Sequence, residues 1–521
     1  MIKVDNLSFK PNFTQADVKQ KLANSLKVDV ANILNYVILK QSIDARRKPD
    51  VKIILSVAVN VKNKKSIKGF LNIEPNFEGL KYDKQNLNVL NPVVVGFGPA
   101  GMFCALALSL MGLNPIVVEQ GLDVDAREKE VFKFWETGKL NKTCNVQFGE
   151  GGAGTFSDGK LNTNLNNPYC GKVINEFVLN GAPSEIAYIN KPHIGSDNLK
   201  TVVKNIRNKI INNGGKVLFN TQFVDYELQN GTVSAVIVKN LENGAEYEIK
   251  TNNVVLALGH SAKDSFNLLY NKGIQIKQKP FAMGVRIEQL QSQINKSQYG
   301  KEQLGLPSAD YKLAVHLPNG RSVFTFCMCP GGVVVNSASD QNEVVTNGMS
   351  YFARDGKNAN SAVLCNVNPT DFNSDHPLAG IYFQQKYERL AFDLTKNHIC
   401  PAQSVGEFLT GEKHKLKVEP STKVTFANLK QCLPNFVYES LKQALPLLDN
   451  KLKGFSDYGN LLIGIESRSS SPVTIVRDDN FESSEKGIYP CGEGAGYAGG
   501  IISSAVDGIK VAEAILKNIK K

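Results

Sequence analysis

The sequence predicts an α/β protein built on a parallel sheet, with a second, sheet-rich segment inserted before the last strand of that sheet. Three observations predict this class. Residues 93–101 lead an apolar strand into a Gly-x-Gly-x-x-Gly turn, residues 253–259 return a buried strand to another glycine turn, and residues 487–500 lead a third strand into a run of glycines. Between the second and third segments, strand and helix no longer alternate, which indicates an insertion.

The first glycine turn has the spacing of a dinucleotide-binding site. Gly96 permits the tight turn, Gly98 lets the backbone approach a pyrophosphate, and Gly101 lets the next helix pack against the strand. The N-terminus of that helix then faces the phosphates. A strand over 114–118 ends at Glu119, 18 residues beyond Gly101, where the carboxylate can accept hydrogen bonds from an adenosine ribose. The unit is therefore predicted to be Rossmann-like.

The two downstream segments favour a flavin over a nicotinamide dinucleotide. Short strands over 216–219, 223–228 and 233–238 precede the strand that returns to the nucleotide fold. Glu493 ends the last strand and can hold a ribityl or ribose hydroxyl, and the glycines that follow let the helix over 501–515 approach the isoalloxazine ring. A nicotinamide cofactor has no ribityl chain, so the predicted cofactor is FAD.

A second three-glycine pattern lies at 149–154. Residues 145–148 make a poor buried strand and residues 155–160 do not continue as an amphipathic helix, so a second dinucleotide fold is not expected. We favour a loop whose backbone N–H groups pass close to the pyrophosphate or the flavin ring. A plain surface loop is the alternative.

Four motifs together resemble a known family. Residues 96–101, 147–161, 327–332 and 492–500 are similar to a family of bacterial proteins described only as FAD-dependent dehydrogenases, and the similarity runs over nearly the whole chain. A more distant resemblance is to the flavoproteins that include geranylgeranyl reductases and aromatic-ring hydroxylases. The resemblance implies an FAD domain interrupted by a substrate domain, and it implies no defined substrate.

Three units are therefore predicted. Residues 1–90 form a small basic α/β module, residues 91–272 and 460–521 form the FAD-binding domain, and residues 273–459 form a sheet-based cap with strands at 282–288 and 322–328. We expect the substrate to lie between cap and flavin, because small-molecule sites favour domain junctions. The residues predicted to contact FAD are Gly96, Gly98, Pro99, Ala100, Gly101, Glu119, Gln120, Arg127, Gly152, Gly154, Thr155, Ser157, Asp158, Val224, Ala257, Gly259, Gly492, Glu493, Gly499, Gly500 and Ile501.

No catalytic residue is assigned, but four are candidates. Cys327 and Cys329 are placed on one face of a strand by alternation, as a redox pair beside the flavin or, the interpretation we favour, as two small buried side chains. Arg468 could bind a carboxylate or the reduced flavin, or could equally form a surface ion pair with Glu466. Lys160, with Asp158, is a candidate for polar contacts near the ring.

The roles of one arginine and two histidines are left open. Arg127 lies on the helix expected over 123–137, where it could reach the pyrophosphate or belong to a solvated face. His193 and His260 could act as acids or bases, but lone histidines are more often structural and neither is given a role.

Charge and cysteine content limit the partners and the compartment that the sequence allows. Residues 1–87 hold 16 Lys and Arg against 8 Asp and Glu, so this segment carries +8 of the net charge of +11. Its apolar spacing suggests one or two helices, a strand over 53–61 and a lysine-rich turn over 62–68. Nine scattered cysteines indicate reduced thiols and no zinc site. Without a signal or spanning segment, we expect a cytoplasmic protein.

The leading functional hypothesis is an FAD-dependent oxidoreductase that passes a hydride between flavin N5 and an organic substrate. The electron donor is left open, because no second nicotinamide-binding fold is visible in the sequence. An alternative is a flavoprotein that binds RNA through the basic module, although a solvated lysine face explains the same charge and is favoured. A peripheral membrane reductase lacks the basic amphipathic anchor it would need.

Overall fold

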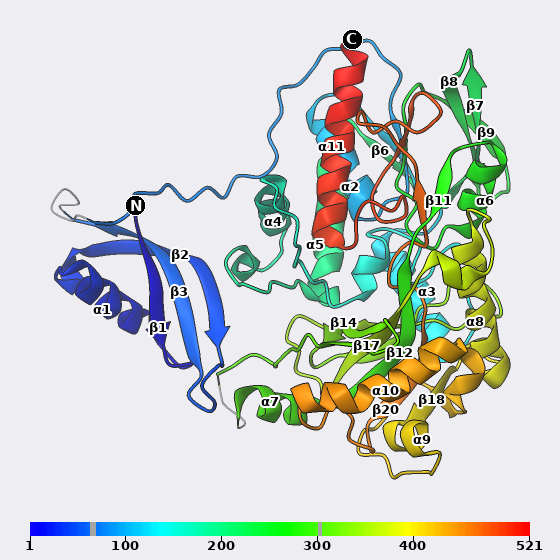
Figure 1. The fold of residues 1–521 in the computed structure, drawn as a ribbon. Coiled ribbons are helices and arrows are strands. Elements are labelled where there is room, and N and C mark those ends of the chain that lie inside the picture. The colour runs from blue at the N-terminus through cyan, green and yellow to red at the C-terminus, as the bar shows by residue number, and fades with distance from the viewer. Residues whose placement is uncertain (63–68, 301–304) are drawn as a thin grey trace.

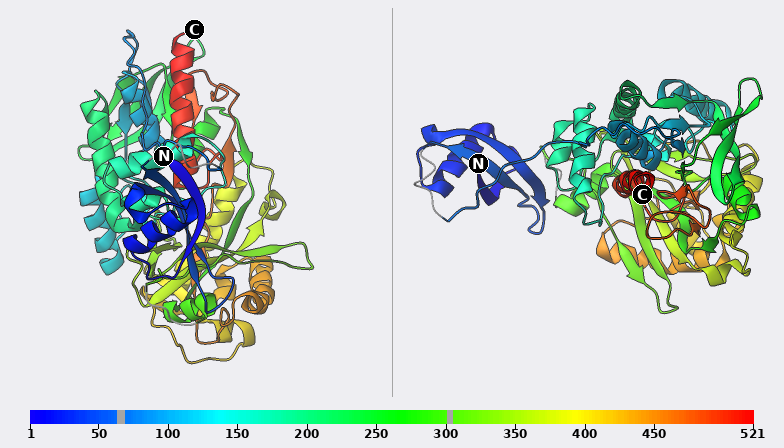
Figure 2. Two further views of the ribbon diagram at one scale, coloured as in Figure 1. Left: turned by 90° about the vertical axis from the view of Figure 1, so that its left-hand side faces the viewer. Right: turned by 90° about the horizontal axis from the view of Figure 1, so that it is seen from above.

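The N-terminal module is an antiparallel sheet with one helix. The computed structural model describes residues 1–62, 69–300 and 305–521. The sheet has the order β1-β3-β2, and α1 packs on it over a small apolar core, to one side of the main body (Figures 1 and 2). Among the described residues of this module only one α-helix forms, because the β-branched stretch that follows extends as β2. The predicted turn lies, after its first residue, outside the described residues. The elements are β1 (Ile2–Phe9), α1 (Gln15–Leu26), η1 (Val30–Asn32), β2 (Ile33–Asp44) and β3 (Lys52–Val61).

A five-stranded parallel sheet with the order β22-β10-β4-β5-β6 forms the nucleotide fold. Its three glycine turns follow neighbouring strands, so they meet at one edge. The helices α2 and α11 lie side by side on one face (Figure 1). They pack closely because Gly508 has no side chain, and a Cβ there would lie 2.1 Å from the Ala100 carbonyl oxygen. The strands are β4 (Val93–Val95), β5 (Ile116–Val118), β6 (Lys216–Leu218), β10 (Val254–Leu256) and β22 (Ile488–Pro490).

Helices and a small antiparallel sheet complete this body. The sheet β7-β8-β9 adjoins the other face of the parallel sheet, where both contribute to one apolar core. The elements are α2 (Pro99–Leu110), α3 (Val124–Thr137), η3 (Ala153–Phe156), α4 (Tyr169–Leu179), η4 (Ser184–Ala187), α5 (Gly195–Asn212), β7 (Thr221–Gln229), β8 (Thr232–Asn240), β9 (Glu246–Lys250), α6 (Lys263–Asn271) and α11 (Ile501–Ile519).

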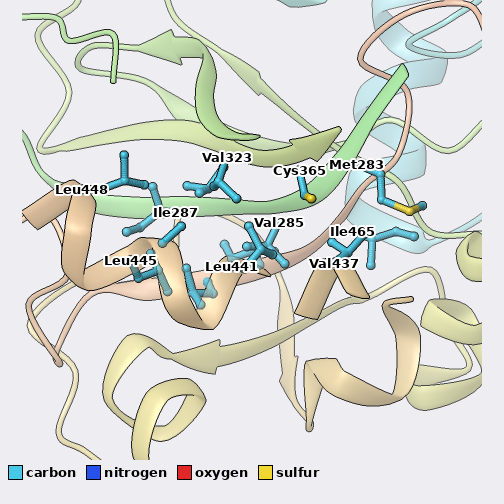
Figure 3. Close-up of a cluster of buried hydrophobic side chains, with 14 of the residues drawn as sticks. Met283, Val285, Ile287, Val323, Cys365, Val437, Leu441, Leu445, Leu448 and Ile465 are labelled. Atoms are coloured by element: carbon cyan, nitrogen blue, oxygen red, sulfur yellow. The ribbon is translucent and has the colours of Figure 1, made fainter. Parts of the chain in front are cut away.

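The inserted segment is built on a seven-stranded sheet with the order β13-β14-β17-β12-β20-β18-β19. The helix α10 lays Val437, Leu441, Leu445 and Leu448 on the apolar face of that sheet (Figure 3). The strands are β11 (Ile276–Gln278), β12 (Phe281–Leu290), β13 (Ala314–His316), β14 (Ser322–Cys329), β15 (Val333–Asn336), β16 (Thr346–Met349), β17 (Asn358–Val367), β18 (Cys400–Ser404), β19 (Val424–Phe426), β20 (Leu461–Glu466) and β21 (Val473–Ile475). The helices are α7 (Gln291–Tyr299), η5 (Pro369–Phe372), α8 (Ala379–Thr395), α9 (Val405–Thr410), η6 (Leu429–Cys432) and α10 (Asn435–Lys451).

The strand β20 lies in this sheet and not in the nucleotide fold. It pairs with β12 on one side and β18 on the other. The predicted boundary at residue 459 therefore cuts one strand from the sheet to which it belongs. Its composition is apolar, which suits either core. Among the described residues, no helix is long and apolar enough to cross a bilayer.

Candidate functional site

The first glycine turn packs too closely for side chains. Gly96 has φ of 96°, and a Cβ on it would lie 2.3 Å from the Ala257 carbonyl oxygen. A Cβ on Gly101 would lie 2.0 Å from the Gly96 carbonyl oxygen. Gly98 is the N-cap of α2, and Pro99 follows in the first turn. The helix N-terminus therefore opens directly above the end of β4, as the spacing predicts.

Glu119 binds the turn that it adjoins. Its carboxylate is buried and accepts hydrogen bonds from the backbone N–H groups of Phe97 (2.9 Å), Gly121 (2.8 Å) and Gly149 (2.9 Å). An ionised carboxylate offers about four acceptor positions. One position is left for a hydroxyl, so Glu119 both fixes the backbone and keeps the capacity to bind a ribose.

The glycine-rich loop lies against the first turn. The N–H of Gly151 donates to the Phe97 carbonyl at 2.9 Å, and a Cβ on Gly152 would lie 2.9 Å from the Gly98 Cα. Gly149, Gly151 and Gly152 all have positive φ, which glycine adopts without strain. Only the short η3 follows, so no second dinucleotide fold forms, in agreement with the sequence analysis.

Arg127 has a role that neither sequence interpretation included. Its side chain is fully buried and donates to the carbonyl oxygens of Asn145 (3.0 Å), Val146 (3.0 Å), Gly149 (3.2 Å) and Glu150 (2.6 Å). Burial lowers the pKa of the guanidinium to about 10, so it stays charged. Arg127 is neither solvated nor aimed at the pyrophosphate, because the loop carbonyls occupy its donors.

The C-terminal turn follows β22 and reaches the same edge of the parallel sheet. Gly492 has φ of 77° and donates its N–H to the Asp507 carboxylate at 2.7 Å. Gly500 is the N-cap of α11, and a Cβ on it or on Gly499 would meet no atom within 4 Å. The N-terminus of α11 therefore opens onto free space. Burial raises the pKa of the Glu493 carboxyl beside it to about 7.

One cavity of about 350 Å³ joins the two glycine clusters. The predicted residues that line it are Gly96, Gly98, Pro99, Ala100, Glu119, Gly152, Gly154, Ser157, Ala257, Gly259, Glu493, Gly499, Gly500 and Ile501. A smaller cavity of about 50 Å³ shares Gly96 and Glu119 with it and adds Gln120 and Phe223. The convergence that the sequence predicted is thus present in the fold.

Six predicted contacts lie outside the lining of these two cavities. Gly101 and Gly492 act through backbone packing, and Arg127 holds the loop. Thr155 donates to the Glu150 carbonyl at 3.3 Å, and Asp158 pairs with Lys160 at 2.9 Å. Val224 lies where the register between β7 and β8 shifts, while its neighbour Phe223 lines the smaller cavity. Successive residues on a strand point to opposite faces, so Val224 and Phe223 cannot both face this cavity.

The inserted sheet supplies the far wall of the cavity. Cys327 on β14, Glu466 on β20 and Arg468 just after β20 line the cavity. Lys160, from the nucleotide fold, lines it with them. The Asp158 carboxylate is buried behind Lys160, also receives Arg354 Nε at 2.9 Å and the Ser350 hydroxyl at 2.7 Å, and keeps a low pKa despite burial because of the two cations. Asp158 therefore positions Lys160 and does not itself face the cavity.

Arg468 is buried, so the surface ion pair with Glu466, one of its two sequence interpretations, does not form. The guanidinium donates to Glu388 (2.7 and 2.9 Å) and Glu343 (3.0 Å), and also to the hydroxyls of Ser261 (3.1 Å) and Ser339 (2.6 Å). These bonds use all five of its N–H donors. Arg468 therefore braces the wall and has no donor left for a substrate carboxylate.

Glu466 pairs instead with Arg286, which the sequence analysis missed. Arg286 is fully buried and binds the Glu466 carboxylate at 2.6 and 2.8 Å. An arginine inside the apolar strand over 282–288 was the available signal, because a buried charge needs a partner. His260 also lines the cavity, and burial lowers its pKa to about 4, so its imidazole is neutral. The other lining residues not predicted are Phe97, Gln147, Phe148, Ala153, Asn162, Leu258, Ser261, Phe326, Asn347, Cys491 and Ser504.

Comparison with known proteins gives the family. Residues 280–469 match the family model described as "FAD-dependent protein, C-terminal domain-like", and residues 1–60 match a domain of unknown function. An uncharacterised protein of Clostridium beijerinckii is 44% identical over 532 residues, which cover 99% of this chain and 98% of that protein. The chain belongs to this family of FAD-dependent proteins. The resemblance found in the sequence is confirmed, and FAD is its cofactor.

Solved flavoprotein structures resemble the chain more distantly. The glycerol-3-phosphate dehydrogenase from Bacillus halodurans complexed with FAD is 12% identical, with a TM-score of 0.36, and the match covers 83% of this chain and 64% of that one. The glycine oxidase from Bacillus cereus is 11% identical, with a TM-score of 0.34, and the match covers 82% and 95%.

The cavity fits FAD by its own chemistry. Two helix N-termini, at Gly98 and Gly500, open onto it, and each favours negative charge. The glycines at 499 and 500 leave free the space that side chains would fill. Glu119 keeps one acceptor position at one end and Glu493 lies at the other. A group with phosphates in the middle and hydroxyls on both sides matches this order.

Proposed function

We propose that the protein is an FAD-dependent oxidoreductase that transfers a hydride between flavin N5 and an organic substrate held against the inserted sheet. The main support for this proposal is the single cavity that runs from the first glycine turn to side chains of that sheet. When bound, FAD supplies the acceptor or donor of two electrons. The protein binds and orients the reactants and keeps water from them.

The binding roles follow from position. Glu119 and Gln120 hold the adenosine end, the N-terminus of α2 with the loop at 152–154 holds the pyrophosphate, and Glu493 with the N-terminus of α11 holds the ribityl and ring. The substrate then binds against the part of the cavity lining that the inserted sheet forms.

Three groups of the nucleotide fold that also line the cavity can bind and move protons. Lys160 is an ammonium held by Asp158, and it can orient a carbonyl or an anionic substrate. The carboxyl of Glu493, with a pKa of about 7, can hold a proton at neutral pH. His260 is a neutral imidazole that lies 3.1 Å from the Ser261 hydroxyl.

Filling the space before α11 tests the proposal. Gly500 is extended, with φ of 172°, it lines the cavity, and a Cβ there meets no protein atom within 4 Å. We expect Gly500→Leu to fold and to bind FAD about tenfold to a hundredfold more weakly, because overpacking costs about 1–3 kcal/mol. The matched control is Gly171→Leu, on the exposed surface of α4 with no atom within 4 Å of its Cβ.

The readouts are flavin content after purification, titration with FAD and reduction by candidate substrates. Equal FAD affinity of Gly500→Leu, Gly171→Leu and the parent protein would show that the cavity is not the FAD site. Failure of the parent to use any substrate or carrier as a hydride donor or acceptor, while it retains FAD, would contradict the oxidoreductase proposal.

A further inference from the structure

Two cysteines stand where the inserted sheet meets the cavity. The pairing of β14 with β17 shifts register between Phe326 and Cys329, so that Cys327 and Met328 together lie opposite Ser361. This is a β-bulge, and Cys327 within it has φ of 43°. Strict alternation, on which the sequence prediction relied, is broken here. The bulge leaves Cys327 partly exposed in the lining of the cavity, while Cys329 is buried behind it.

The two cysteines are hydrogen-bonded to each other. The Cys329 thiol donates to the Cys327 carbonyl oxygen at 3.3 Å. Gly348 makes room for it, since a Cβ at that position would lie 2.8 Å from Cys329 Sγ. The favoured sequence interpretation, two inert buried side chains, holds for the burial of Cys329 but not for Cys327.

Cations surround the pair. Lys160 donates to the carbonyl of Met328, the residue between the cysteines, and Arg286 Nη1 donates to the Cys327 carbonyl at 3.2 Å. The hydrogen bond from Cys329, followed by Lys160 and Arg286, lowers the pKa of the Cys327 thiol to about 6, while that of Cys329 is raised. The pair thus shares one proton at neutral pH. In contrast, burial alone raises the pKa of Cys400 to about 12.

The pair lies at the flavin end of the cavity. Cys327 lines the same cavity as Glu493, the acid that we assign to the ribityl chain, and after burial its charge also contributes to the raised pKa of Glu493. The cavity continues from Cys327 to Gly499 and Gly500 at the N-terminus of α11.

We propose that Cys327 and Cys329 are a redox-active dithiol that exchanges two electrons with FAD, which makes a thiol or disulfide compound a substrate class for this site. This proposal rests on the proposed function. In the oxidation, the Cys327–Cys329 S–S bond forms and the Cys329 S–H bond breaks. The dithiol loses two electrons and FAD gains them; FAD also takes two protons, one from Cys329 and one from solvent, because Cys327 is already a thiolate. The reverse reaction reduces the disulfide.

A tryptic peptide makes the redox state measurable. Cleavage after Arg321 and Arg354 releases residues 322–354, which contain these two cysteines and no others. The FAD-loaded protein is oxidised with diamide, freed of reagent and placed under argon, and the flavin is then reduced by illumination with EDTA. Samples taken before and after illumination are denatured in acid, alkylated with N-ethylmaleimide and weighed by mass spectrometry.

We expect the peptide to carry a disulfide before illumination and two alkyl groups afterwards. The oxidised protein should also take up about twice as many electrons per flavin as Cys327→Ser or Cys329→Ser, because the disulfide accepts a second pair. Cys400→Ser, which removes a buried thiol of the same sheet, should behave as the parent does. A long-wavelength thiolate–flavin absorbance band that titrates near pH 6 should be absent only in Cys327→Ser among the single variants.

Three outcomes would overturn the proposal or its basis. A peptide that remains a dithiol after diamide, or a disulfide that survives full reduction of the flavin, overturns the dithiol. If the same protein still transfers hydride to an organic substrate, the proposed function stands without it. A protein that takes up no FAD, as judged from its visible absorbance, overturns both.

Discussion

Arg127→Met is expected to release the glycine-rich loop while leaving most of its core volume filled. The guanidinium makes four hydrogen bonds to carbonyl oxygens of residues 145–150, and those residues are largely buried. The loss of each bond costs about 1 kcal/mol. Removing the buried charge offsets part of this loss of stability, because methionine carries no desolvation penalty. The net destabilisation is about 3 kcal/mol, which corresponds to roughly a hundredfold change in the opening equilibrium.

The chain contains one tryptophan, and it reports on this region. Trp135 lies on α3, donates to the Asn336 carbonyl at 2.8 Å and meets the Phe156 ring edge-on at 6.1 Å. The Arg127 guanidinium lies over the same Phe156 ring, 4.9 Å from its centroid. Urea unfolding followed by Trp135 fluorescence therefore measures the stability of the segment that Arg127 holds.

The control is Lys204→Met, whose ammonium pairs with Asp125 at 2.6 Å but is 46% exposed. Exposed pairs of this kind contribute at most about 1 kcal/mol. We expect Arg127→Met to lower the midpoint and weaken FAD binding, and Lys204→Met to change neither. If Arg127→Met shifts the unfolding free energy no more than Lys204→Met does, the loop does not depend on its guanidinium and our account of Arg127 is incorrect.

Two further predictions concern buried charges. Because burial raises the pKa of Glu493 from 4.5 to about 7, folding opposes its ionisation, and the stability of the FAD-free protein should fall by about 3 kcal/mol as pH rises from 4.5 to 7; thermal melts should show Glu493→Gln gaining stability relative to the parent across that window and no further above it. Arg468→Met leaves Glu343 and Glu388 with fewer partners and should cost about 3–5 kcal/mol. Arg389→Met, removing a 61% exposed partner 3.9 Å from Glu343, should cost under about 0.5 kcal/mol, and equal denaturation midpoints for the two variants would refute this difference.

The cofactor-binding turns could be predicted from sequence because glycine spacing reports backbone geometry directly. At Gly96 a positive φ and a carbonyl 2.3 Å from any Cβ leave glycine alone acceptable, so residue type and local structure carry the same information. The strand and acid that follow are also local. Their order along the chain was sufficient to place Glu119 and Glu493 at one cavity.

The partners of charged side chains could not be predicted in this way. Arg127 reaches a loop 18 to 23 residues ahead, and Arg286 reaches Glu466 across 180 residues. Periodicity places such a residue on a helix or strand but does not say what covers it. The bulge at Cys327 is equally hidden, because it arises from pairing with β17, and the two cysteines read as a regular strand until that partner is known.

The insertion point explains why the inserted sheet meets the cofactor. The chain leaves the parallel sheet after β10 and returns to it as β22, the neighbouring strand, and both strands end at the edge that carries the glycine turns. Residues between them are therefore attached at both ends beside the cavity. The nucleotide fold lines the cavity with its glycine turns, while Cys327 and Arg468 come from the insertion. Substitutions on the cavity wall of the inserted sheet can therefore change the substrate while FAD binding is retained, whereas a change at the glycine turns removes both.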